Sequence, residues 1–461
     1  MTRATSSPQH LVDHALETSA SPECVVIVQD ETHANLRWAN NTLTTNGVGH
    51  DVGVTVIAFR DGATASVSST AASTERVTVL VEAADAAVRR AQPAEDRNDL
   101  VSGDAAADWD DAPAATSIEV YGAFAKALGE EFERAEAEQR VLYGFVNHEI
   151  ATTYLGSSTG LRRRHVQPTG HYACTGKTAD LSTSAWVGGA TRDFTDVDAH
   201  AMADTLTTRL GWATRRVDLP AGRYDTVLPP TCVADVMLDA YWGAGARVAH
   251  EGQSVYARRG GGTRIGERVG RPGTHLYSDP AYPGLECEPF VLASSSGNTS
   301  SVFDNGLPLA RTEWVSDGIL SSLIQTRHSA TMTGQPVTPG IDNLVLEVDG
   351  ASGSIDDLVA DVDHGLLLTC MWYIREVDPQ TMLLTGLTRD GVYLVEGGEI
   401  TGAVNNFRWN ESPVDLLRRY TAASATVPGL SREWGDDYFS RTAMPGLRVP
   451  DFNMSSVSQA L

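Results

Sequence analysis

The chain of 461 residues contains few cysteines and no long apolar run. Its five cysteines are scattered, and no two of them form a C-x-x-C pair. Such a set does not suit a disulfide-stabilised fold or a structural zinc site, so it favours a reducing compartment. No stretch of about 18 apolar residues is present, which is the length that a membrane-spanning helix needs. The first ten residues are polar and lack the apolar core of a secretory signal. We therefore expect a cytoplasmic protein.

Positive charge is also scarce. The chain has 35 Lys and Arg against 59 Asp and Glu, a formal net charge of −24 and a pI near 4.8. Binding to phosphate groups needs clustered Lys and Arg. The balance therefore argues against nucleic acid and anionic membranes as partners. A hydrophobic content of 42% is ordinary for a folded protein, and the length suffices for two or three domains.

Short strands and a few amphipathic helices alternate along the chain, which predicts an α+β fold. Strands separated by tight turns are expected over residues 24–70, and helices over residues 77–91, 117–140 and 196–210. From residue 222 onward, short strands and Gly/Pro turns predict a large, curved, mostly antiparallel sheet or a barrel-like body. We divide the chain into an N-terminal α+β domain (1–95), an acidic connector (96–116), a central α+β region (117–221) and a C-terminal β-rich domain (222–461).

The most distinctive segment covers residues 371–413. Its paired glycines, Gly397 and Gly398, predict a hairpin because glycine adopts positive φ without steric cost. The segment reads W-Y-I-R-x-V-x-P…T-G-L-T-R-D-G-x-Y-L-V-E-x-G-E-I…V-x-N-F-R-W-x-x-S. This pattern resembles the C-terminal domain of the TldD/PmbA (TldE) family, whose members are subunits or modulators of a zinc metalloprotease. The resemblance is strongest from about residue 222 onward.

Catalytic members of that family carry H-E-x-x-x-H on the helix that follows the strand entering the C-terminal domain. Two such histidines can share a zinc ion while the glutamate activates water. The corresponding residues here, 231–240, read T-C-V-A-D-V-M-L-D-A and contain no histidine. The late cysteine of the catalytic members is also missing, since no cysteine follows Cys370, which we expect to be a buried small side chain. The resemblance is therefore to the TldE type, with no cofactor in this chain and zinc in its partner.

Three other motifs could carry chemistry in this chain. The pairs His148-Glu149 and His250-Glu251 lack a second histidine at the required spacing and are expected to be polar surface groups. Residues 156–160 match G-x-S-x-G, but a nucleophile elbow needs a helix after the serine, and the polar sequence that follows predicts a hairpin. The basic residues 162–164 are expected to be solvated, or to pair with carboxylates across a subunit interface.

The resemblance implies a non-catalytic TldE/PmbA-like subunit that pairs with a zinc-bearing TldD-like subunit to degrade or mature peptides. The peptide would enter as an extended strand, because main-chain hydrogen bonds give affinity without sequence preference. We expect the wall that holds it to include Arg375, Asn405, Asn406 and Arg408. The alternatives are a non-catalytic scaffold or modulator without a protease partner, including a homodimer, and a hydrolase with Ser158 as nucleophile.

Overall fold

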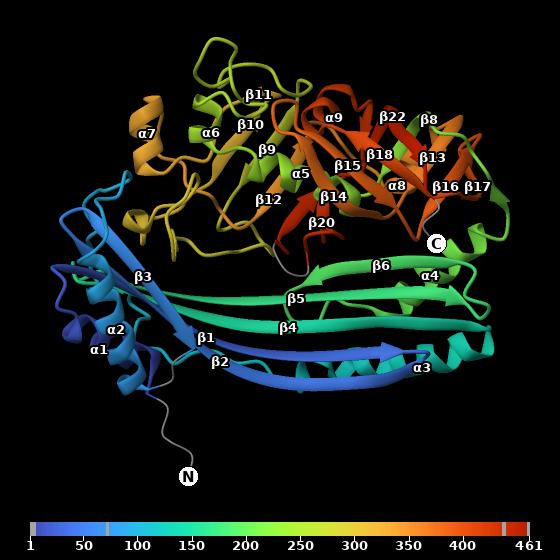
Figure 1. The fold of residues 1–461 in the computed structure, drawn as a ribbon. Helices are drawn as coiled ribbons and strands as arrows, with labels where there is room; N and C mark the ends of the chain where they lie inside the picture. The colour runs from blue at the N-terminus through green and yellow to red at the C-terminus, as the bar shows by residue number, and fades with distance from the viewer. Residues whose placement is uncertain (1–5, 71–72, 436–438, 459–461) are drawn as a thin grey trace.

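A six-stranded antiparallel sheet runs the length of the molecule beneath the C-terminal half of the chain in the computed structural model (Figure 1). The structure describes residues 6–70, 73–435 and 439–458. The strand order of this long sheet is β3-β2-β1-β4-β5-β6. Its strands are β1 (Glu23–Ala39), β2 (Thr42–Arg60), β3 (Ala63–Thr70), β4 (Arg140–Ser157), β5 (Arg162–Thr178) and β6 (Ser184–Thr191). Short strands were expected within residues 24–70. The structure has three strands there, and two of them, β1 and β2, are long.

Alternation along the strands gives the long sheet two different faces, since successive side chains point to opposite sides. One face is apolar and packs on helices: α1 (Pro8–Thr18) and α2 (Thr74–Val88) cover Val26 and Val28 at one end. At the other end α3 (Gly122–Ala137), entered through the short helix η1 (Ile118–Tyr121), and α4 (Ala199–Trp212) cover Leu36 and Trp38. The opposite face looks toward the C-terminal layer. The helices predicted over residues 77–91, 117–140 and 196–210 are therefore present, with ends shifted by a few residues.

The acidic segment of residues 96–116 is held against the long sheet by the basic cluster at the start of β5. The Arg162 guanidinium lies 5.6 Å from the ring centre of Trp109, and Arg164 pairs with Asp108 at 3.2 Å. Trp109 in turn packs edge-on against Tyr154, with ring centres 5.6 Å apart. Arg162 forms an ion pair with Asp13 at 3.0 Å. Two of the three basic residues, Arg162 and Arg164, thus form ion pairs within the chain.

The C-terminal half builds two further sheets. One has the order β14-β15-β18-β22-β8-β13-β16-β17-β7, with β19 (Ala422–Ala423) paired to β22. Its strands are β7 (Arg216–Val217), β8 (Gly222–Leu228), β13 (His364–Leu368), β14 (Met371–Asp378), β15 (Leu383–Thr388), β16 (Val392–Glu396), β17 (Glu399–Val404), β18 (Phe407–Glu411) and β22 (Leu447–Val457). The other has the order β11-β10-β9-β12-β21-β20 and consists of β9 (Thr274–Ser278), β10 (Thr312–Ser316), β11 (Ile319–Leu320), β12 (Leu344–Val348), β20 (Val427–Gly429) and β21 (Thr442–Met444).

The α+β class is confirmed, but the expected barrel-like closure is wrong, because both sheets of the C-terminal layer are open. The reason lies in α5 (Pro230–Trp242), which is buried among residues of both sheets and fills the space that a barrel would enclose. A helix that is apolar on nearly all sides belongs in a core. The remaining short helices are α6 (Ala246–His250), η2 (Val302–Asp304), α7 (Arg327–Thr333), α8 (Ile355–Ala360) and α9 (Pro413–Arg419).

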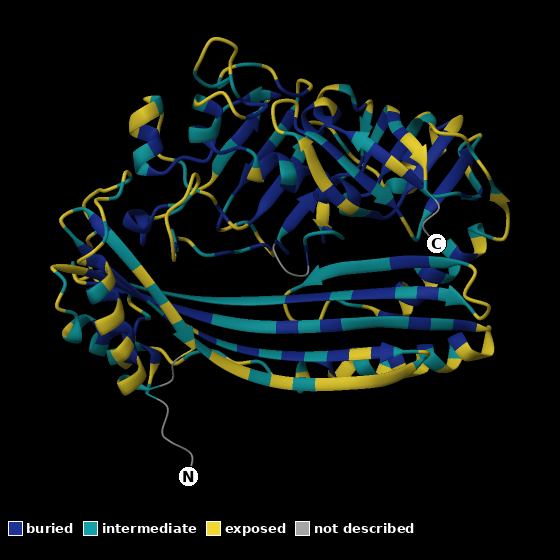
Figure 2. Ribbon diagram, viewed as in Figure 1, coloured by how far each residue is buried: buried dark blue, intermediate teal, exposed yellow. Residues whose placement is uncertain are grey.

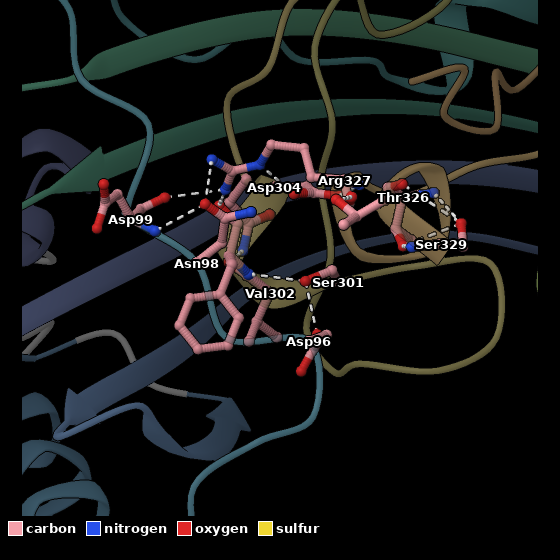
Figure 3. A network of polar contacts seen from close by, with 12 residues as sticks. Asp96, Asn98, Asp99, Ser301, Val302, Asp304, Thr326, Arg327 and Ser329 are labelled. Carbon is pink, nitrogen blue, oxygen red and sulfur yellow. Dashed lines mark hydrogen bonds and ion pairs between the residues drawn. The ribbon is translucent and has the colours of Figure 1, made fainter. Parts of the chain in front are cut away.

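The loop around η2 joins the two layers. The Phe303 ring packs edge-on against Phe59 of the long sheet, with ring centres 5.1 Å apart, in a cluster that also contains Ile27 and Leu155. Beside it, the buried carboxylate of Asp304 accepts a hydrogen bond from Arg327 Nε at 2.6 Å (Figure 3). Figure 2 shows the strands of the C-terminal layer mostly buried, whereas the outer strand β2 is exposed along much of its length.

The predicted hairpin at Gly397 and Gly398 is present between β16 and β17, and both glycines have positive φ. A Cβ atom on Gly398 would lie 2.6 Å from the carbonyl oxygen of Ala360, whereas one on Gly397 would meet nothing within 4 Å. Gly397→Ala should lower the free energy of unfolding by roughly 1–2 kcal/mol, because of its left-handed backbone alone. Gly398→Ala should cost about 1–3 kcal/mol more, since the backbone must also shift. Urea unfolding of both variants checks this, and equal losses would contradict it.

Candidate functional site

Helix α5, which contains residues 231–240, carries two carboxylates and no histidine. Asp235 and Asp239 are four residues apart and therefore lie on one face. Asp235 is fully buried, and its Oδ1 accepts hydrogen bonds from Ser431 Oγ at 2.6 Å and from the Glu433 amide at 3.0 Å. The carboxylate thus fastens the loop of residues 431–434 to the helix.

Burial changes the ionisation of both groups. It raises the pKa of Asp235 to about 7, although the two hydrogen bonds that it accepts oppose the change. Burial likewise raises the pKa of Asp239 to about 7, and the charges of Asp235, Glu376 and Glu433 add to this effect, while a hydrogen bond from Trp434 opposes it. Both side chains therefore exchange protons near neutral pH.

A third carboxylate, Glu433, connects this centre to the edge of the neighbouring sheet. Its oxygens accept hydrogen bonds from the backbone amides of Tyr373 at 3.1 Å and Ile374 at 3.2 Å, at a bulge in β14 where Tyr373 has a φ of 53°. Arg375 Nη1 lies 3.3 Å from the same carboxylate. The centre therefore positions a loop and a strand edge. Within residues 6–70, 73–435 and 439–458, no group of three or more His, Cys, Asp or Glu side chains is placed to hold a metal ion. That this chain needs no cofactor stays a prediction.

The four residues predicted to line a peptide-binding wall fall into two places. Arg375 on β14 pairs with Glu433, and Arg408 on β18 is exposed and donates to Thr385 Oγ1 at 3.4 Å. Thr385 lies opposite Arg375 in the β14–β15 pair, so the two arginines reach one stretch of the sheet. Asn405 and Asn406 lie elsewhere, between β17 and β18. Their contact with a substrate remains a prediction.

Asn405 and Asn406 line a pocket of about 330 Å³ between the ends of β5 and β6 and the C-terminal layer. Asn405 Oδ1 accepts a hydrogen bond from the Leu219 amide at 2.7 Å, and Asn406 Oδ1 accepts one from Thr388 Oγ1 at 3.2 Å. Both amide groups therefore have structural roles. The pocket is also lined by Lys177, Arg216 and Arg389, three cations in a chain of strongly negative net charge.

In the His-Glu pair on β4, the expected surface position is wrong for His148, which is buried, whereas Glu149 is half-buried. The ring is buried, with Nδ1 2.6 Å from Thr116 Oγ1 and Nε2 2.8 Å from the Arg192 carbonyl oxygen. Burial also raises the pKa of Glu149 to about 7, an effect to which the charge of Glu31 adds and which Arg441 opposes. Glu149 lies on the face of the long sheet that looks toward the C-terminal layer. The sequence showed the pair but not its burial, because short-range alternation on β4 does not reveal what covers each face.

Two other predictions concern single residues. Ser158 lies in the hairpin between β4 and β5, as predicted, and its Oγ accepts a hydrogen bond from the Cys24 amide at 3.0 Å. No helix follows it, so the geometry of a nucleophile elbow is missing at this place. Cys370 is buried, as expected, and burial raises its pKa to about 12.

The carboxylates of α5 and Glu433 were not singled out from the sequence. A signal was available, since two aspartates at a spacing of four residues interrupt an otherwise apolar helix. Buried carboxylates are rare unless they have a partner. The partner loop lies almost 200 residues further along the chain, and only the fold shows that it is adjacent.

The fold and the sequence together define a class: a two-layer, metallopeptidase-like α+β protein. The model of the PmbA/TldA metallopeptidase C-terminal domain matches residues 221–456, and that of the PmbA/TldA metallopeptidase domain 1 matches residues 24–91. The first match alone covers half of the chain, so this chain belongs to the PmbA/TldD family.

Three solved structures share the fold over nearly their whole length. TldE from Thermococcus kodakarensis has a TM-score of 0.74 at 14% identity, over 96% of this chain and 99% of its own. A protein from Thermotoga maritima described as a candidate modulator of a DNA gyrase has a TM-score of 0.75 at 17% identity, with 96% and 98% covered. A similarly described protein from Bacteroides thetaiotaomicron has a TM-score of 0.71 at 14% identity, with 97% and 98% covered.

At these identities the likeness concerns the fold. Comparison with curated protein sequences found no match. Among the described residues, no helix has the length and apolar character to cross a membrane.

Proposed function

We propose that this chain is the non-catalytic, cytoplasmic subunit of a peptide-degrading or peptide-maturing metalloprotease, and that it pairs with a zinc-bearing subunit of the same family. The observation that carries the proposal is the composition of α5. Its acidic side chains are Asp235 and Asp239, and Asp235 accepts the hydrogen bonds that hold the loop of residues 431–434. Zinc in proteases is held by imidazoles with an open coordination position, and residues 231–240 supply no imidazole.

The edge strand β14 supports a role in holding peptides. It is the outermost strand of its sheet, and its residues Tyr373 and Val377 are more than half exposed. An exposed strand edge can pair with an extended peptide through main-chain hydrogen bonds. Arg375 and Arg408 stand close to this edge, where they would contact the peptide. Glu433 occupies the amides of Tyr373 and Ile374, so pairing would use the part of β14 beyond the bulge.

Co-expression with a family member that carries H-E-x-x-x-H tests the proposal. We expect a stoichiometric complex on size-exclusion chromatography, zinc in the complex but not in the isolated chain, and peptide cleavage by the complex alone. Ser158→Ala should leave that cleavage unchanged, because the Ser158 hydroxyl has a structural role and accepts a hydrogen bond from the Cys24 amide. A tightly bound, stoichiometric zinc ion in the isolated chain together with cleavage would contradict the proposal. A stable homodimer that forms no complex with any family member carrying H-E-x-x-x-H would favour the scaffold alternative.

A further inference from the structure

A second pocket lies at the N-terminal end of α5. Its volume is about 550 Å³, and it is bordered by Gly188 and Gly189 of β6, Pro230 and Thr231 of α5, and Gly429 of β20. Because β6 is the last strand in the order of the long sheet, the pocket adjoins an outer strand edge. The pocket therefore offers backbone groups of a strand and of a helix end to the same space.

One basic side chain, Arg209 of α4, lines this pocket without an acidic partner. Its Nη1 donates a hydrogen bond to the carbonyl oxygen of Trp186. Burial lowers its pKa. Among the described residues it forms no ion pair. Arg209 is partly buried, and a cation that loses hydration without gaining a counter-charge is destabilised. Arg209 therefore creates a positive potential inside the pocket.

The first turn of α5 adds donors of the same polarity. The helix has 13 residues, begins with Pro230, and receives no side-chain cap from Pro229. The first amides of a helix have no partner within the helix, and the helix dipole favours an anion at this end. Arg209 borders the same cavity as Pro230 and Thr231 of this first turn, so the side chain and the helix end face one space. Two independent features thus favour the same kind of ligand.

The remaining lining contains little that would repel an anion. Its one acidic residue is Asp356, an exposed side chain in the first turn of α8. Ile355 and Val427 give the pocket an apolar side that an alkyl side chain can contact. The planar fork of arginine matches a carboxylate, which it can bind through two parallel hydrogen bonds.

We propose that this pocket binds the carboxylate group of a peptide, with the Arg209 guanidinium and the first-turn amides of α5 as donors. The identification of the ligand as a peptide rests on the proposed function, whereas the anion site stands on the pocket itself. A peptide lying along β6 would present its terminal carboxylate, or an acidic side chain, to Arg209. The chain would then select substrates by charge as well as by extended shape.

Calorimetric titration of the isolated full-length chain tests this without any partner subunit. The probes are an N-acetylated tri-alanine peptide with a free carboxylate, the same peptide with a C-terminal amide, and inorganic phosphate at matched ionic strength. We expect the free acid to bind and the amide to bind at least about tenfold more weakly, because a hydrogen bond to a charged group is lost. Equal binding of the two peptides would overturn the proposal, as would Arg209-dependent binding of phosphate but not of the peptide acid.

Four variants assign the binding to the pocket. Arg209→Met should weaken binding of the acid by at least about tenfold, and Arg209→Lys by less, since it keeps the charge but loses the fork. Asp356→Asn should tighten binding about two- to fivefold, because a like charge is removed. Arg418→Met, at an exposed position on α9, is the control and should change nothing. If Arg209→Met does not fold, the affinities of Arg209→Lys and Asp356→Asn for the peptide acid still test whether it binds in this pocket. Unchanged affinity in both would overturn the proposal.

Discussion

Arg327→Ala is expected to lower the free energy of unfolding by about 3–5 kcal/mol, because it leaves the buried carboxylate of Asp304 without a counter-charge. Figure 3 shows the guanidinium reaching Asp304 and the segment that carries Asn98 and Asp99. Nε donates to Asp304 Oδ1 at 2.6 Å, and Nη2 donates to the carbonyl oxygens of Asp99, at 2.9 Å, and of Phe303. Arg327 therefore holds together the loop that docks the two layers.

Chemical unfolding of the wild type, the variant and two further variants checks this expectation. Arg418→Ala removes an exposed arginine whose partner, Asp415, lies 3.4 Å away, and should change stability by no more than about 0.5 kcal/mol. The double variant Arg327→Ala/Asp304→Asn should be more stable than Arg327→Ala alone, because the neutral amide needs no counter-charge. A loss below about 1 kcal/mol for Arg327→Ala would show that water solvates Asp304 in its place.

The sequence predicts local features of this fold better than long-range ones. Helices with a clear apolar stripe and the hairpin at Gly397 and Gly398 were found where expected, because their signals lie within a few residues of each other. The continuity of β1 over 17 residues was missed, since polar residues on one face of the long sheet break the apolar pattern without breaking the strand. The open sheets were missed because nothing in the short strands shows that α5 occupies the interior.

The candidate site was predictable only in part, for the same reason. The missing imidazoles at residues 231–240 could be read directly from the sequence. That Asp235 holds residues 431 and 433, or that Arg209 lies at the first turn of α5, depends on contacts between distant segments. The basic residues 162–164 illustrate the point, because Arg162 pairs with Asp13 and Arg164 with Asp108, and both carboxylates lie far away along the chain.

The second large effect concerns the carboxylates of α5 and depends on pH. The pKa of Asp239 is raised from 3.8 to about 7 in the folded chain, so the folded state binds this proton more tightly than the unfolded state. The free energy of unfolding must then fall as the pH rises from about 4 to about 7, where the folded protein is forced to bury a charge. Because the pKa differs by about three units between the two states, the loss in the free energy of unfolding is at most about 4 kcal/mol.

Asp239→Asn removes this titration and keeps a side chain of nearly the same size and shape. The variant should be more stable than the wild type at pH 8, and its advantage should grow by about 2–3 kcal/mol between pH 5 and pH 8. Urea unfolding at both pH values measures the difference, and Asp415→Asn, at an exposed position on α9, controls for the exchange itself. An advantage of equal size at pH 5 and pH 8 would mean that Asp239 is already ionised at no cost. In that case the charge of Asp239 would be compensated within the fold at both pH values.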